Sequence, residues 1–239
     1  MAFTAQKFAY RHPTFGRSKV AKSSEPYKNS VYYLWWEFLR RNEGYKKCCE
    51  NGGNGRYSKL YKDFGDVHLP DFKTWWQTNN RGATLFGEIV PPEFKVIEDI
   101  TNCQKYDRTI YLQVSLDLPK RFLTSQFNKI LNKHHSGSRG RRTNKNSTAK
   151  YPIIGHVDIL ALQKCLDVYD MKLNNPGMRQ WEIGQKCKVT RPHQFIKVGD
   201  TEAEVTSKKL VLTSTTNRLL KKARLIISKT VEGQFPVLK

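Results

Sequence analysis

The N-terminal half of the chain places apolar residues at helical spacing. One face of the segment 28–49 carries Val31, Leu34, Trp35, Phe38, Tyr45 and Cys49. Apolar residues three, four and seven positions apart are typical of an amphipathic helix, so we predict one helix over 28–49, capped by Asn29 or Ser30. Because the aromatic side chains share this stripe, core packing is favoured over stacking on nucleic-acid bases. The glycine-rich segment 51–56 should end the helix.

Shorter patterns predict the other elements of this half. Helices are expected over 57–64 and over 71–77, the second capped by Asp71. An alternation of apolar residues, the period of a strand, predicts a strand over 108–116 from Ile110, Leu112, Val114 and Leu116. A further helix, which runs on into a basic segment, is indicated by Phe122, Phe127, Ile130 and Leu131.

Beyond residue 150 the pattern is helical. The segment 156–173 places on one stripe Ile159, Leu162, Leu166, Tyr169 and Leu173. The Asn-Asn-Pro-Gly turn at 174–177 precedes a short helix over 178–187. The last helix should start near the capping residues 213–215 and run to about residue 230, with an inward face of Leu219, Leu220, Ala223, Ile226 and Ile227. These patterns predict a mainly α fold with a small β component, in which a helical N-terminal domain precedes a C-terminal helix-turn-helix-like module.

The composition of the chain is strongly basic, which favours a negatively charged partner. The 239 residues include 42 Lys and Arg against 21 Asp and Glu, which gives a formal net charge of +21. Such an excess repels itself unless a polyanion offsets it, and nucleic acid is the commonest polyanionic partner. No apolar run is long enough to span a membrane, the first residues lack the apolar core of a signal peptide, and the five cysteines suit reduced thiols. We therefore expect a cytoplasmic protein with no membrane partner.

The basic residues also divide the chain. Residues 1–24 carry five bases and no acid and are predicted to form a flexible arm. Residues 135–150 again carry five bases and no acid, so we predict a basic linker there, between an N-terminal domain at 25–134 and a nucleic-acid-binding domain at 151–239. The linker bases that should contact phosphates are Arg139, Arg141, Arg142 and Lys145.

The segment 178–198 fits the order of parts in a helix-turn-helix. Gly184 supplies a small residue where two helices approach, Lys188 stands in the turn, and Thr190 can cap a recognition helix. The residues expected to face outward and contact nucleic acid are Arg191, His193, Gln194 and Lys197. A plain helical hairpin remains the structural alternative, and the basic linker and last helix favour the DNA-binding interpretation.

Two groups of residues resemble a known family. In the C-terminal part these are Leu173-Asn-Asn-Pro-Gly-Met-Arg-Gln-Trp-Glu-Ile-Gly184 and Thr216-Asn-Arg-Leu-Leu-Lys-Lys-Ala-Arg-Leu-Ile-Ile227, and in the N-terminal part Tyr33-Leu-Trp-Trp-Glu-Phe-Leu-Arg-Arg-Asn-Glu-Gly-Tyr45. They are similar to segments of transcriptional regulators encoded on bacterial integrative elements and phages. The resemblance implies DNA binding by the C-terminal module. Because 188–212 departs from the family pattern, a second candidate for the groove-reading element is the later helix, with Asn217, Arg218, Lys221 and Lys222.

Other chemistry has less support. The histidines and cysteines lack zinc-ligand spacing, and the acids Asp63, Asp66, Asp71, Glu88 and Glu93 suit capping as well as a magnesium site. We therefore expect no enzyme, no metal and no cofactor. The expected function is DNA binding by a transcriptional regulator or other accessory factor of a phage or mobile element. The alternatives are an assembly protein, capsid-associated, whose basic surface binds acidic protein faces, and a metal-dependent nuclease. The sequence leaves open a homo-oligomer or an acidic protein partner.

Overall fold

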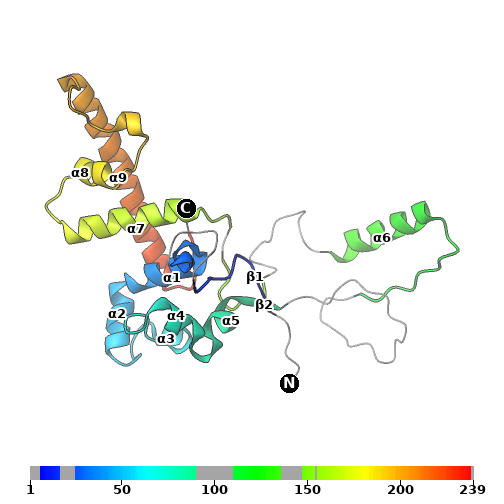
Figure 1. The fold of residues 1–239 in the computed structure, drawn as a ribbon. Helices are drawn as coiled ribbons and strands as arrows, with labels where there is room; N and C mark the ends of the chain where they lie inside the picture. The colour runs from blue at the N-terminus through cyan, green and yellow to red at the C-terminus, as the bar shows by residue number, and fades with distance from the viewer. Residues whose placement is uncertain (1–5, 17–24, 90–109, 136–146, 154, 238–239) are drawn as a thin grey trace.

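The computed structural model describes residues 6–16, 25–89, 110–135, 147–153 and 155–237. These residues form a mainly helical fold with one two-stranded sheet (Figure 1), so the predicted mainly α class with a small β component is confirmed. The helices are α1 (Val31–Arg40), α2 (Glu43–Glu50), α3 (Ser58–Phe64), α4 (Phe72–Gln77), α5 (Arg81–Phe86), α6 (Lys120–His134), α7 (Ile159–Asn174), α8 (Gln180–Lys186) and α9 (Glu202–Thr230). Short 3-10 turns are η1 (Pro26–Asn29), η2 (Thr78–Asn80) and η4 (Pro192–Gln194), and β1 (Gln6–Phe8) pairs antiparallel with β2 (Gly87–Ile89).

The single helix predicted over 28–49 is two helices. Ser30 caps α1 through a hydrogen bond that its hydroxyl accepts from the backbone N–H of Tyr32. The chain then breaks at 41–42, where Asn42 caps α2 by accepting from the N–H of Tyr45 at 2.9 Å. A second capping residue inside the apolar pattern therefore divides one helix into two while both parts keep a common buried face. All six residues of the predicted stripe are buried.

Trp35 lies at the centre of an aromatic core. Its side chain is fully buried, and its ring centroid lies 5.2 Å from that of Phe86 and 5.2 Å from that of Phe235. Trp36 and Tyr32, on another face of α1, are also buried, with the Tyr32 ring 5.3 Å from Trp76. The prediction that the aromatics of the stripe pack in a core is confirmed.

This core is shared by segments from both halves of the sequence. Its members after residue 150 are Val157, Leu162, Cys165, Leu166, Ala223, Ile226, Ile227, Val231 and Phe235. The end of the predicted linker and the residue after it also contact α3, since Asp63 accepts hydrogen bonds from Lys150 at 2.5 Å and from the Tyr151 hydroxyl at 2.6 Å. The predicted boundary at 135–150 therefore does not separate two cores, because α1 buries one surface with residues from both sides of it.

The described part of the N-terminal arm is packed rather than flexible. Phe8, Tyr10 and Phe15 lie against the core, and the Tyr10 hydroxyl donates to the carbonyl of Gly155 at 2.5 Å. Trp76 donates from its indole N–H to His12 at 3.3 Å. Charge alone predicted a solvated arm, and the aromatic residues between the bases attach residues 6–16 to the core instead.

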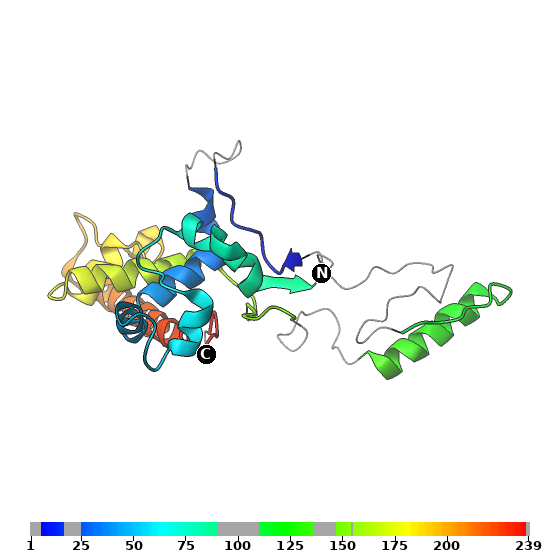
Figure 2. The ribbon, with the colours of Figure 1, turned by 90° about the horizontal axis from the view of Figure 1, so that it is seen from below.

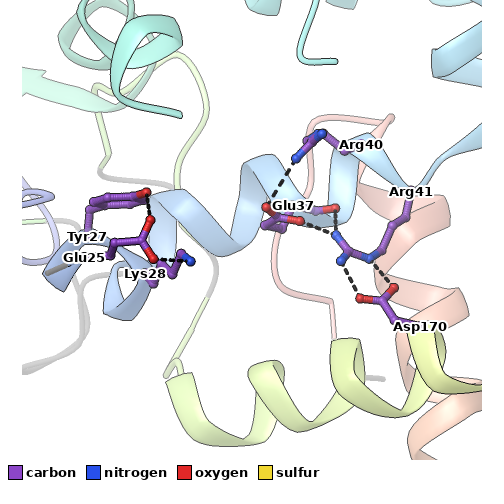
Figure 3. Close-up of polar contacts among 7 residues, drawn as sticks. All are labelled: Glu25, Tyr27, Lys28, Glu37, Arg40, Arg41 and Asp170. Carbon is purple, nitrogen blue, oxygen red and sulfur yellow. Dashed lines mark hydrogen bonds and ion pairs between the residues drawn. The ribbon is translucent and has the colours of Figure 1, made fainter. Parts of the chain in front are cut away.

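An arginine fork joins α1 to α7 (Figure 3). Arg41 donates to both carboxylate oxygens of Asp170, at 2.7 and 2.5 Å, and to Glu37 at 2.5 Å. Burial by itself lowers the pKa of the guanidinium, but the hydrogen bonds that it donates to these carboxylates raise its pKa above the ordinary value. Two-point pairing of this kind fixes orientation as well as distance, so the fork sets the angle between the first helix of the core and α7.

Replacing Asp170 with Asn is expected to lower the free energy of unfolding by about 1–3 kcal/mol, the usual scale for hydrogen bonds to a charged group. Asp167 on the same helix is the matched control, because its carboxylate is 57% exposed and lies 3.7 Å from Lys164. Asp167→Asn should change stability by about 0.5 kcal/mol or less. Urea unfolding of both variants measures the difference, and equal effects would show that the fork contributes nothing of its own.

Of the two elements predicted between residues 108 and 134, a strand and a helix, only the helix is present in the structure. Residues 110–116 form no strand, and the alternating apolar side chains that predicted one are 40–87% exposed. A strand requires a neighbour for its backbone groups, and the sheet that the described residues form contains β1 and β2 alone. The predicted helix after residue 119 does form as α6, but it buries no residue and lies apart from the other helices in Figure 1 and Figure 2.

The last helix is much longer than predicted. It begins at Glu202 rather than near residue 213, because Thr201 and Glu204 form a capping box: the Glu204 carboxylate accepts from the Thr201 N–H at 2.8 Å. On α7, four of the five predicted stripe residues are buried or half-buried, whereas Leu173 is 61% exposed. The helix turns this residue outward where α7 ends.

Candidate nucleic-acid interface

The helices α7, α8 and α9 form the C-terminal unit, which carries the predicted binding residues after residue 190 (Figure 1). Gly184 of α8 is at the closest approach to α9. A Cβ atom at this position would lie 2.5 Å from the Thr216 hydroxyl oxygen and 3.2 Å from the Leu212 carbonyl oxygen. The prediction that Gly184 lies where two helices nearly touch is therefore confirmed, although the facing helix is α9 rather than a helix at 190–198.

The predicted recognition helix at 190–198 is wrong. Only the three residues of η4 are helical there, because the backbone at Arg191 and at Phe195 is extended on either side of it. Lys188 does occupy a tight turn and has a positive φ of 50°, a conformation in which glycine is favoured. Thr190 caps no helix, and its buried hydroxyl has no hydrogen-bond partner among the described residues.

The segment 188–200, which we name the α8–α9 loop, is held in place by two side-chain clamps. The Gln185 amide on α8 donates to the carbonyl of Ile196 at 2.9 Å and accepts from its N–H at 3.0 Å. Asp200 accepts from the backbone N–H of Lys197 at 2.7 Å and from the Lys208 ammonium at 2.6 Å. These hydrogen bonds lower the pKa of the Asp200 carboxyl, with the Lys208 bond as the first cause. The loop is thus tied to both helices that flank it.

The cationic side chains of this loop point to solvent. Arg191, His193 and Lys197 are exposed, as predicted, and no ion pair joins them to another described residue. Gln194 is half-buried, and its side-chain oxygen accepts from the Arg191 N–H at 3.4 Å, so it serves the loop itself. Lys208, by contrast, is neutralised in its pair with Asp200.

A second set of bases lies on α9, on the side away from its buried stripe. We name Asn217, Arg218, Lys221 and Arg224 the outer stripe. All four are exposed, and within the described residues none of the three bases forms an ion pair. Lys222 was predicted to join them but is half-buried, and near Cys165 its charge offsets part of the rise that burial causes in the pKa of that thiol. Arg224 was missed by sequence reasoning, although its spacing of three from Lys221 was available as a signal.

The structure does not bring the two sets together. At about 100° per residue, Asn217, Lys221 and Arg224 lie about 180°, 140° and 160° around the α9 axis from Lys208, where the loop is anchored. Arg218, at about 80°, lies on the flank between the two sides. The linker bases Arg139, Arg141, Arg142 and Lys145 lie outside the described residues.

The acidic residues considered for a magnesium site have separate structural roles. Asp63 binds Lys150 and Tyr151, Asp66 accepts from the backbone N–H of His68 at 2.7 Å, and Asp71 caps α4. Glu88 accepts from the Ser147 hydroxyl at 3.0 Å, and Glu93 lies outside the described residues. Among the residues that the structure describes, no three His, Cys, Asp or Glu side chains lie close enough together to hold a metal ion.

The cysteines of the described segments are buried and unpaired. Burial raises the pKa of the Cys165 thiol to about 11, and it raises the pKa of Cys49 to about 11 as well. Both are therefore neutral thiols at physiological pH, and since the thiolate is the reactive form, they pack as small apolar side chains.

None of the helices in the described segments is both long and apolar enough to cross a bilayer. Searches of protein families, of curated protein sequences and of solved structures give no match to this chain.

Proposed function

We propose that the protein binds duplex DNA through the outer stripe of α9, as a transcriptional regulator or other accessory factor of a phage or mobile element. The observation that carries the proposal is the charge pattern on this helix. Arg218, Lys221 and Arg224 are exposed and unpaired among the described residues, and the segment 205–231 contains seven bases and no acid. A surface of this kind attracts phosphates. Among the described residues, carboxylates pair with Lys208 and Lys229 at other positions of the segment but not with the three bases of the stripe.

The support of the stripe matters as much as its charge. α9 has 29 residues and is therefore about 43 Å long. Its opposite face is buried against α1, α7 and α8, so the cations stand at fixed spacing on a rigid helix. Phosphate contacts set position and affinity, and Asn217 at the stripe can form paired hydrogen bonds with adenine. We therefore assign the contact with DNA to α9, the later helix and the second of the two candidates for the element that reads the groove.

The triple substitution Arg218→Gln, Lys221→Gln, Arg224→Gln is expected to weaken binding to a random-sequence duplex at least about tenfold near physiological salt. Because each phosphate contact contributes about 0.9 to the slope of log affinity against log salt, the slope should become shallower by about 2.7. Fluorescence anisotropy over a series of salt concentrations measures both quantities.

The control removes the same charge from another exposed surface, through Lys46→Gln, Lys47→Gln and Lys59→Gln on α2 and α3. It should leave the slope within about one counterion of the parent. Equal losses of duplex affinity in the two triple variants would mean that the stripe contributes only through the net charge of the protein. If the parent does not bind duplex even at low salt, the proposal fails, and the acidic face of a protein becomes the better candidate partner.

A further inference from the structure

The α8–α9 loop forms a second cationic surface that the outer stripe does not use. Its exposed bases, with the adjoining end of α8, are Lys186, Lys188, Arg191 and Lys197, accompanied by His193. The segment 183–199 contains no acid, and none of these bases forms an ion pair with another described residue. We name these five residues the loop surface.

The loop surface is preformed. The Gln185 amide uses its donor and its acceptor on the backbone of one residue, Ile196, and Asp200 holds both Lys197 and Lys208. Lys208 and Asp200 are only 18% and 11% exposed at their side chains, so this second clamp is largely withdrawn from water. Both clamps act at Ile196 and Lys197, the C-terminal end of the basic segment, and tie that end to α8 and to α9. Rigid presentation lowers the entropy lost when a ligand binds.

The two surfaces face in different directions. α8 packs on the side of α9 that carries Leu212 and Thr216, and the loop is tied to α8 and to Lys208. Lys221 and Arg224 lie about 140° and 160° around the helix axis from Lys208. A helix with its side chains is about 10 Å across, so Lys221 and Arg224 are separated from Lys208 by about that thickness, whereas Arg218 lies on the flank between the two sides. A straight duplex that lies over Lys221 and Arg224 is therefore on the side of α9 away from Lys208, to which the loop is tied.

We propose that a single copy of the protein bridges two duplexes, one on the outer stripe and the other on the loop surface. The inference rests on the proposed function, because both surfaces are assigned the same ligand, the DNA phosphate backbone. It goes beyond that function, since a protein with one DNA-binding surface occupies a site, whereas a protein with two opposed surfaces holds distant DNA segments together.

The test uses two unrelated duplexes and the full chain. One duplex is attached to beads, the protein is added below saturation, and capture of a second, fluorescent duplex is measured at low salt. The variants are the stripe triple Arg218→Gln, Lys221→Gln, Arg224→Gln, and the loop triple Lys186→Gln, Arg191→Gln, Lys197→Gln. The α2–α3 triple at Lys46, Lys47 and Lys59 is the charge-matched control. Protein concentrations are adjusted so that each variant occupies the same fraction of the bead-bound duplex.

The parent and the control should capture the second duplex, and both surface triples should bind the first duplex yet reduce capture of the second at least tenfold. Normal capture by the loop triple would overturn the inference, because a dimer with one site per copy bridges without the loop surface. A parent that binds single duplexes but captures no second one would overturn it as well, and would leave the proposed function standing. A parent that binds no duplex contradicts the proposed function itself.

Discussion

Replacing Trp35 with Ala is expected to lower the free energy of unfolding by about 3–5 kcal/mol, the usual cost of removing a large buried aromatic side chain. The ring has no exposed surface and contacts Phe64 and Phe86 from one half of the sequence and Tyr151 and Phe235 from the other. Urea unfolding followed by circular dichroism should therefore show one transition at lower denaturant, in which both halves unfold together.

Trp181→Ala is the control for this substitution. Trp181 is half-buried on α8, with the Lys209 ammonium 5.0 Å from its ring, so its loss should cost much less than that of Trp35. If Trp35→Ala melts like the parent and loses a ligand instead, the aromatic surface of α1 is a binding surface, and its assignment to the core is wrong.

Replacing Gly184 with Val is expected to destabilise the C-terminal unit by about 1–3 kcal/mol or more, the scale of overpacking in a tight interior. The added Cβ would lie 2.5 Å from the Thr216 hydroxyl oxygen, and Thr216 has no exposed surface into which it can withdraw. α8 would have to separate from α9, which also displaces the Gln185 clamp. Thermal unfolding of the variant and its duplex binding should therefore change together.

Gly177→Val provides a matched control, because a Cβ atom at Gly177 meets nothing within 4 Å and its backbone is not left-handed. The substitution is identical, and only the packing of the site differs. Comparable melting temperatures for the two variants would mean that α8 and α9 can separate without cost, contrary to the close approach at Thr216.

The sequence predicts the core better than it predicts where elements begin and end. Periodicity found the buried face of α1, because apolar spacing directly reflects which side of a helix meets the core. It joined α1 and α2, since the apolar stripe continues across the cap at Asn42. It placed the start of α9 too late, because Thr213 is a good capping residue that lies inside the helix while Thr201 and Glu204 form the cap.

The candidate surface was harder to predict for a different reason. Exposure of Arg191, Lys197 and Lys221 follows from their charge, and these residues were identified. The conformation of the α8–α9 loop depends on Gln185 and Asp200, whose partners are backbone groups and a lysine several residues away. Spacing along the chain does not reveal such contacts, so an extended, clamped loop was mistaken for a recognition helix.

The shared core has a consequence for how the chain folds during its synthesis. The buried face of α1 is covered in part by Ala223, Ile226 and Phe235, so it stays incomplete until residue 235 has been made. Contacts between residues so far apart in sequence form slowly, because a long loop must close before they contribute. Until then the aromatic surface around Trp35 is open to other chains. A growing copy of this protein is therefore most prone to aggregate just before α9 docks.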